Sequence, residues 1–178
     1  IHERLVGSEM CIRDRYAPSK TFNLAGLVGS YHIIFNKMLR DRVEAKSRKS
    51  HYNTMNVLSM HALIGAYEAE GYTWVNELCQ VLSENVDYAV NHIRDYYRGI
   101  EVSKPQGTYM LFLDCEDWCE ENYKSLDELL KAGWDVGVAW QDGRPFMNPN
   151  TIRMNLAVPH ALVKEAMDRL DKYVFNAK

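Results

Sequence analysis

The chain has 178 residues, of which 47% are hydrophobic and 25% charged, and its formal net charge at pH 7 is -3. This composition is typical of a globular protein of one or two domains. The weak negative charge excludes the basic surface that nucleic acid or an anionic membrane would need, and the densest basic run, residues 40–49, is interrupted by acidic residues. We therefore expect neither nucleic acid nor a membrane as a partner.

Two further features indicate a cytoplasmic protein. The apolar runs are too short to span a bilayer, and IHERLVGSEM carries charges where a signal peptide needs its apolar segment. The cysteines, Cys11, Cys79, Cys115 and Cys119, show neither a CxxC pair nor the density of a disulfide scaffold, so we expect reduced and mostly buried thiols. In DCEDWCE two thiolates would supply only two of the four ligands that zinc needs, and no further pair lies near in sequence. We therefore expect a structural cysteine after a strand and no metal site.

The first part of the chain predicts helices after a turn that contains a lysine. Turn-forming residues surround Lys20 in APSKTFNLAGL, and an apolar, helix-like segment follows Gly26. Residues 53–70 are apolar on most faces and predict a largely buried helix, which the segment EGY ends. From Thr73, a candidate N-cap, the apolar spacing predicts one long amphipathic helix that Gly99 ends.

After Gly99 the sequence predicts a lobe rich in strands. We expect strands at 100–104, 108–114, 135–140 and 151–158, turns at 105–107 and 141–150, and helices at 125–133 and 160–175. Strands with helices packed on them define an α+β or α/β arrangement. We place an approximate domain boundary inside the long helix, near residues 88–98.

One strand residue is a candidate for binding an anion. In TIRMNLAV, the alternation of a strand puts Ile152 and Met154 on one face and Arg153 on the other, away from the core. A guanidinium on a rigid strand suits bidentate capture of a carboxylate. The alternative is a surface arginine paired with a neighbouring acidic residue, and the strand alone favours that alternative.

Lys20 is a candidate nucleophile. Pro18 fixes the approach of the chain, and Ser19 and Thr21 offer hydroxyls on either side of the lysine. A desolvated lysine in such a turn can form a Schiff base. Most lysines beside turns are solvated, so the turn alone favours an ordinary surface lysine.

Four segments taken together resemble a known family. SKTFNLAGL, KPQGTYMLFLD, AGWDVGVAWQDGRPF and IRMNLAVPHALVKEAMDRL resemble, in this order and at these separations, the C-terminal half of class I/II pyridoxal-phosphate enzymes, most closely the cystathionine β-lyase-like (MalY/PatB) group. The resemblance runs from about residue 17 to residue 176. It implies an α/β fold, namely the C-terminal part of a fold type I transferase: the end of the large domain, a long interdomain helix and a small α+β domain.

The resemblance also implies roles for three residues. Lys20 is the lysine that forms the internal aldimine with pyridoxal 5'-phosphate, and its freed amine then takes the Cα proton of the substrate. Arg153 binds the α-carboxylate of the amino-acid substrate. Ser19 is a candidate contact of the cofactor phosphate, although the family reaches that phosphate mainly through residues upstream.

The activity implied for the full-length parent is a C–S β-lyase that acts on sulfur amino acids and gives thiol, pyruvate and ammonia. An aminotransferase of the same family stays open, because the motifs do not separate the two outcomes. A non-catalytic interaction or regulatory module that retains the fold also stays open. The family implies a homodimer for the full-length parent.

The residues up to about residue 15 do not resemble the family, whose members carry most of the large domain before the lysine. We expect residues 1–15 to be non-native, because GSEMCIRDR resembles the translated end of a sequencing adapter. Residues 16–90 would be a remnant of the cofactor-binding large domain and residues 91–178 the small C-terminal domain. Such a fragment is expected to be inactive and to expose apolar surface on the helix at 53–70.

Overall fold

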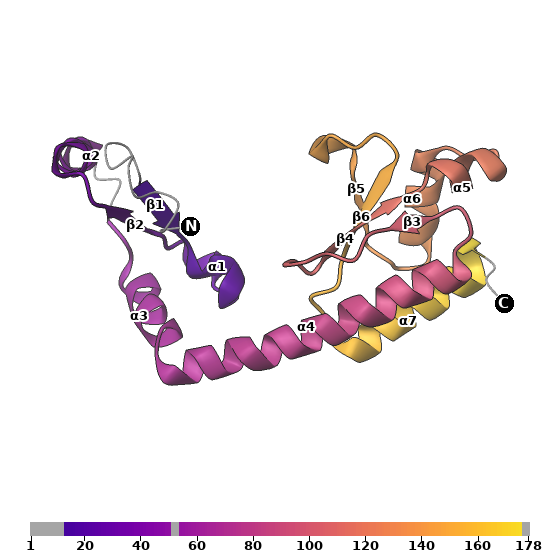
Figure 1. Cartoon of the computed structure of the whole chain (residues 1–178), viewed down its shortest axis with the longest axis horizontal. Helices are drawn as coiled ribbons and strands as arrows, with labels where there is room; N and C mark the ends of the chain where they lie inside the picture. The colour runs from indigo at the N-terminus through magenta and orange to yellow at the C-terminus, as the bar shows by residue number, and fades with distance from the viewer. Residues whose placement is uncertain (1–12, 51–53, 176–178) are drawn as a thin grey trace. The chain divides into compact units, whose positions relative to one another are not determined.

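The computed structural model describes residues 13–50 and 54–175, and the chain divides into two compact units after Asn76. The division falls inside the long helix α4 (Ala69–Tyr96), and the predicted domain boundary lies in the same helix (Figure 1). Cys11 and most of the predicted non-native segment lie outside the described residues. Within the described ranges, no helix is both long and apolar enough to cross a membrane.

The first unit contains a two-stranded antiparallel sheet in which Tyr16 lies opposite Tyr31. Its elements before α4 are β1 (Arg13–Tyr16), α1 (Pro18–Thr21), η2 (Ala25–Leu27), β2 (Tyr31–Ile34), α2 (Lys37–Ser50) and α3 (Val57–Ala66). The predicted helix-like segment after Gly26 is wrong, because the chain makes one 3-10 turn there and then pairs as strand β2. None of the residues of α2 is buried, and Leu39 and Val43 on one side of this helix are partly buried.

Helix α3 exposes an apolar surface. Val57, Leu58 and Ile64 are 63%, 72% and 56% exposed. Within this helix Ser59 is buried, and its hydroxyl donates to the carbonyl of Leu27. The prediction of a largely buried helix is therefore wrong, and the prediction of exposed apolar surface is confirmed.

The junction of α3 and α4 also departs from the prediction. Helix α4 begins at Ala69, and Thr73 is not its N-cap but donates its hydroxyl to the Ala69 carbonyl at 3.1 Å, one turn earlier in the same helix. A Cβ at Gly71 would lie 2.1 Å from the carbonyl oxygen of Ala66. The glycine therefore permits the first turn of α4 to lie against the end of α3, and it does not end a helix.

The second unit is built on a four-stranded antiparallel sheet with the order β3-β4-β6-β5. After α4 its elements are β3 (Glu101–Val102), β4 (Met110–Asp114), α5 (Glu116–Glu121), α6 (Leu126–Asp135), β5 (Gln141–Asp142), η3 (Arg144–Phe146), β6 (Thr151–Asn155), α7 (His160–Leu170) and η4 (Asp171–Phe175). Helix α7 lies beside the C-terminal part of α4 (Figure 1). His92 of α4 contacts Asp171, the first residue of η4, at 2.9 Å. The predicted lobe of strands with packed helices is confirmed.

The predicted strand at 135–140 is wrong. The chain turns at Gly137 with φ +81°, and the hydrogen-bonded strand is β5, inside the predicted turn. Trp140 is buried because it packs into the core, where its Nε1 donates to the carbonyl of Leu130 at 2.9 Å. Alternating apolar residues thus report burial on one side, and they do not show that a neighbouring strand is present.

The core of the second unit lies between the sheet and helices α4, α6 and α7. Its fully buried side chains include Ile93, Leu111, Leu113, Leu129, Leu130, Ile152, Leu156, Met167 and Leu170. Burial of one such side chain contributes about 1.5–3 kcal/mol. In the described part of the first unit, by contrast, the buried residues are Pro18, Phe22 and Ser59.

A buried asparagine joins α4 to the end of β6. Asn85 is fully buried, and its Nδ2 donates to the carbonyls of Leu156 and Val158 at 3.0 and 2.9 Å. Its Oδ1 lies 2.8 Å from Nδ1 of His160, at the start of α7. The side chain therefore satisfies the backbone where the chain leaves the sheet and enters the last helix.

We predict that Asn85→Ala lowers the free energy of unfolding by about 2–3 kcal/mol, because it leaves buried carbonyls without a donor. Urea denaturation followed by tryptophan fluorescence measures the loss. Asn91→Ala is the matched control, since Asn91 is exposed on the same helix. Equal losses in the two variants would contradict the assigned role of Asn85.

The described cysteines are free, and they differ in exposure: Cys115 is buried, Cys119 is intermediate and Cys79 is exposed. The expectation of mostly buried thiols is therefore wrong for Cys79. Cys115 follows β4 as predicted, although the segment after it forms helix α5. Burial raises the pKa of the Cys115 thiol to about 12.

We predict that iodoacetamide at about pH 8 modifies Cys79 in the native chain and leaves Cys115 unmodified, because the thiolate is the reactive form. Peptide mass spectrometry after timed quenching measures both rates in one sample. Unfolding in urea should bring the two rates together. Fast modification of Cys115 in the native chain would contradict the burial of its thiol.

Candidate functional site

Lys20 lies in the short helix α1, which begins with Pro18 at its first turn. The amide of Phe22 donates to the Pro18 carbonyl at 2.9 Å, and the amide of Leu24 donates to Ser19 at 3.0 Å. Asn23 then takes the left-handed conformation, with φ 53°. These local bonds hold the lysine on a closed turn.

An aromatic cluster anchors this turn in the first unit. The ring of Phe22 is buried and packs edge-on against Tyr67 and Tyr72, with centroids 5.1 and 6.3 Å apart. Lys20 itself is exposed, and none of the described residues forms an ion pair with it. Its amine is therefore accessible on a turn that buried packing fixes.

Ser19 lines a cavity of about 800 Å³ in the first unit, together with Tyr31, His32, Arg40 and others. Lys20 is adjacent to Ser19 in the chain but is not among the described residues that line this cavity. The structure thus places the two predicted cofactor residues on one turn, with Ser19 at the cavity and Lys20 in an exposed position.

Arg153 lies in the middle of β6, on the face opposite to the core, as the alternation predicts. The neighbouring residues Ile152 and Met154 are buried. Phe112 of β4 and Gln141 of β5 lie directly across from Arg153, and side chains of such pairs share one face of a sheet. Arg153 therefore has an aromatic neighbour on one side and a carboxamide on the other.

The guanidinium of Arg153 has an unused donor. Its Nε is buried and has no hydrogen-bond partner among the described residues. Its Cζ lies 4.5 Å from the centre of the Phe146 ring, which in turn contacts Phe112 edge-on at 5.8 Å. A buried donor without an acceptor costs about 1–3 kcal/mol, and more when the group is charged.

The described residues also offer Arg153 no ion pair with an acidic side chain. The alternative of an ordinary paired surface arginine therefore does not hold. A cation with a free N–H and an aromatic ring beside it is suited to bind a carboxylate. Lys20 belongs to the first unit and Arg153 to the second.

Three residues around Arg153 have no signal of their own in the sequence: Phe112, Phe146 and Gln141. Phe112 and Gln141 become neighbours through the pairing of β6 with β4 and β5, which depends on strand register. Phe146 reaches the site from η3, inside a stretch that the sequence predicts as a turn. The register of the sheet would have identified Phe112 and Gln141, whereas Phe146 depends on the fold of the turn.

Residues 16–170 match the model of the family described as Aminotransferase class I and II, and the chain therefore belongs to this family of enzymes. Over 117 residues it is 28% identical to the cystathionine beta-lyase PatB of Bacillus subtilis (strain 168), a match that covers 66% of this chain and 30% of that protein. Over 154 residues it is 28% identical to the protein MalY of Escherichia coli (strain K12), with 84% of this chain and 38% of that protein covered. The predicted family and group are confirmed.

The fold agrees with solved structures. A PLP-bound C-S lyase from Staphylococcus hominis is 26% identical and superposes with a TM-score of 0.77, covering 92% of this chain and 41% of that one. The predicted fold class, α/β of the fold type I transferases, is thereby confirmed. The chain spans less than half the length of each of these three proteins.

We predict that Arg153→Met leaves the free energy of unfolding unchanged or raises it by about 1 kcal/mol, because the substitution removes a buried donor that has no acceptor in the described part of the chain. Arg169→Met in the same unit is the control, since Arg169 donates to the Val136 carbonyl and pairs with Glu165. Urea denaturation of both variants measures the difference. A larger loss for Arg153→Met than for Arg169→Met would show that Arg153 is a structural residue.

Proposed function

We propose that the chain is part of a pyridoxal 5'-phosphate-dependent C–S β-lyase that acts on sulfur amino acids and releases thiol, pyruvate and ammonia. The proposal rests on the buried Nε of Arg153 on a central strand, which has no partner among the residues that the structure describes, in a chain that belongs to the aminotransferase class I and II family. The names of the relatives support the reaction, since PatB is named a cystathionine beta-lyase and the Staphylococcus hominis protein a PLP-bound C-S lyase.

The residues present fit the proposed cofactor. The Lys20 amine is exposed and has no ion pair among the described residues, so it is available to hold the cofactor aldehyde covalently. Ser19 lines the cavity, and its hydroxyl would donate to the phosphate. When bound, the cofactor supplies an electron sink for reactions at the Cα of an amino acid.

Arg153 would bind the α-carboxylate of the substrate through in-plane N–H donors, with Nε as one of them. A carboxylate held in this way fixes the orientation of the Cα–H bond. The Lys20 amine would accept the Cα proton. A lyase substrate differs from other amino acids because its Cβ carries a sulfur group that leaves as a thiol.

A second candidate is an aminotransferase of the same family, which the description of the matching family model favours. It would use Lys20 and Arg153 in the same roles and would require a keto-acid acceptor. A non-catalytic module that retains the fold is the third candidate. For the longer protein we propose a cytoplasmic homodimer, in line with the family resemblance.

We predict that the chain, incubated with pyridoxal 5'-phosphate and reduced with borohydride, carries the pyridoxyl group on Lys20. Peptide mass spectrometry locates the modification. Lys20→Ala should lose it, whereas Lys46→Ala, which removes an exposed lysine of α2, should retain it. Equal modification of Lys20 and Lys46 would contradict a cofactor role for Lys20.

A chain completed with the missing part of the enzyme decides among the three candidates. Release of pyruvate from cystathionine without an added keto acid supports the lyase. Turnover that depends on a keto acid supports the aminotransferase. If the completed chain fails in both assays, the non-catalytic module is favoured.

A further inference from the structure

The ring that covers Arg153 comes from a segment with little packing of its own. Element η3 contains no buried residue, and Phe146 is 49% exposed. Backbone bonds close the turn, since the Gly143 amide donates to Thr151 and the Phe146 amide donates to Gly143, both at 2.8 Å. These bonds fix the path of the backbone where the turn begins. They do not fix the Phe146 ring, so its position needs a further restraint.

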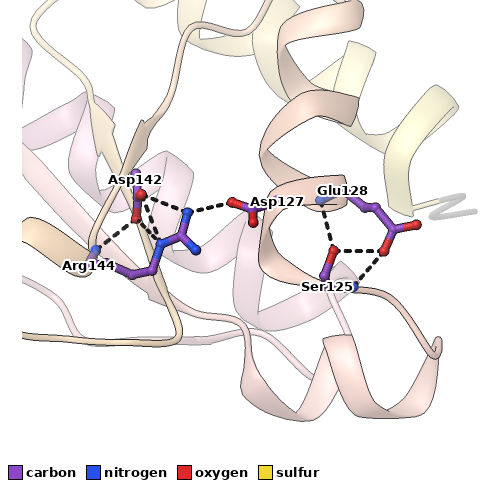
Figure 2. A network of polar contacts seen from close by, with 5 residues as sticks. All are labelled: Ser125, Asp127, Glu128, Asp142 and Arg144. Carbon is purple, nitrogen blue, oxygen red and sulfur yellow. Dashed lines mark hydrogen bonds and ion pairs between the residues drawn. The ribbon is translucent and has the colours of Figure 1, made fainter.

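Arg144 supplies such a restraint through both its backbone amide and its guanidinium. Its backbone amide donates to Oδ1 of Asp142 at 2.9 Å, and its Nε contacts both carboxylate oxygens of Asp142 at 2.9 Å. The far end of the guanidinium pairs with Asp127 of α6. Figure 2 shows the guanidinium between the two carboxylates. This contact with Asp142 holds the pKa of that carboxyl below its usual range.

The second carboxylate is itself fixed, because it lies in the capped first turn of α6. Ser125 accepts from the Glu128 amide at 3.3 Å, and Glu128 accepts from the Ser125 amide at 2.8 Å, which is a capping box (Figure 2). Leu129 and Leu130 of this helix are buried in the core. Asp127 is therefore carried by a helix that cannot move independently of the core.

We propose that Arg144 is a positioning residue for the carboxylate site, a role that rests on the proposed function of Arg153. Arg144 forms ion pairs with Asp142 and Asp127 and thereby holds η3 so that the Phe146 ring covers the Arg153 guanidinium. A contact between a cation and a ring uses none of the N–H donors. The ring thus restrains the guanidinium and leaves its donors for a carboxylate ligand.

The test is the Nε–Hε signal of Arg153 in a nitrogen–proton NMR spectrum of the whole chain, assigned by its loss in Arg153→Lys. In the unsubstituted chain the signal is displaced by the ring current of Phe146 and exchanges slowly with water. In Arg144→Gln the displacement should shrink and the exchange should become about threefold faster or more, as expected when the two exposed ion pairs of Arg144 are lost. Arg144→Lys should restore the signal only in part, since lysine cannot contact two carboxylates in the same way.

Lys131→Gln is the matched control, because it removes the ion pair of Lys131 with Asp135 on the same helix without touching η3. Asp127→Asn should reproduce the effect of Arg144→Gln. An unchanged Arg153 signal in Arg144→Gln, or an equal change in Lys131→Gln, overturns the proposal. Circular dichroism of each variant confirms that the fold is kept.

Titration with acetate separates this proposal from the proposed function. In the unsubstituted chain acetate should shift the Arg153 signal, and Arg144→Gln should weaken the apparent affinity about threefold, because the same two ion pairs are lost. If acetate shifts nothing while Arg144→Gln still alters the Arg153 signal, the carboxylate site fails and the restraint by Arg144 stands. If acetate binds equally well to both proteins, the positioning role is overturned.

Discussion

The alternation of side chains along β6 is the constraint on which the candidate site depends. Ile152 and Met154 are buried, so Arg153 between them must lie on the opposite face. A slip of one residue would put the guanidinium in the core and the apolar side chains in water. Strands β4 and β5 pair with β6 on both sides, and Asn85 holds the chain just after it. The register, and with it the site, is therefore fixed by the core.

Features that depend on local chemistry could be predicted from the sequence. The face of Arg153 follows from alternation within one strand, and the helix at 125–133 is found as α6 because its start signal, Ser125 with Glu128, acts within one turn. The placement of β5 and the contact of Phe146 with Arg153 could not be predicted. Both depend on which distant strand or turn supplies the partner, and an alternating pattern such as that at 135–140 carries no information on this point.

The two units differ in how many apolar side chains they bury, and the two candidate residues are therefore held in place to different degrees. The second unit has an extensive apolar core, so Arg153 is held by many buried side chains at once. The first unit relies on a few aromatic contacts around Phe22, while α3 leaves apolar side chains exposed. An exposed apolar face of this kind marks a surface suited to further contacts. The turn of Lys20 is thus held by far fewer buried side chains than the strand of Arg153.

This difference suits the proposed roles. A residue that orients a carboxylate must keep its direction, because a small displacement of the ligand lowers the rate of the reaction that follows. A lysine that first holds a cofactor and then takes a proton must instead change its bonding partner, so it needs a fixed backbone and a free side chain. Lys20 has both, because local hydrogen bonds and Phe22 fix its turn while its amine is exposed. The rigid Arg153 has a corresponding energetic cost, because its buried Nε finds no acceptor within the described ranges. A bound carboxylate would satisfy this destabilising donor.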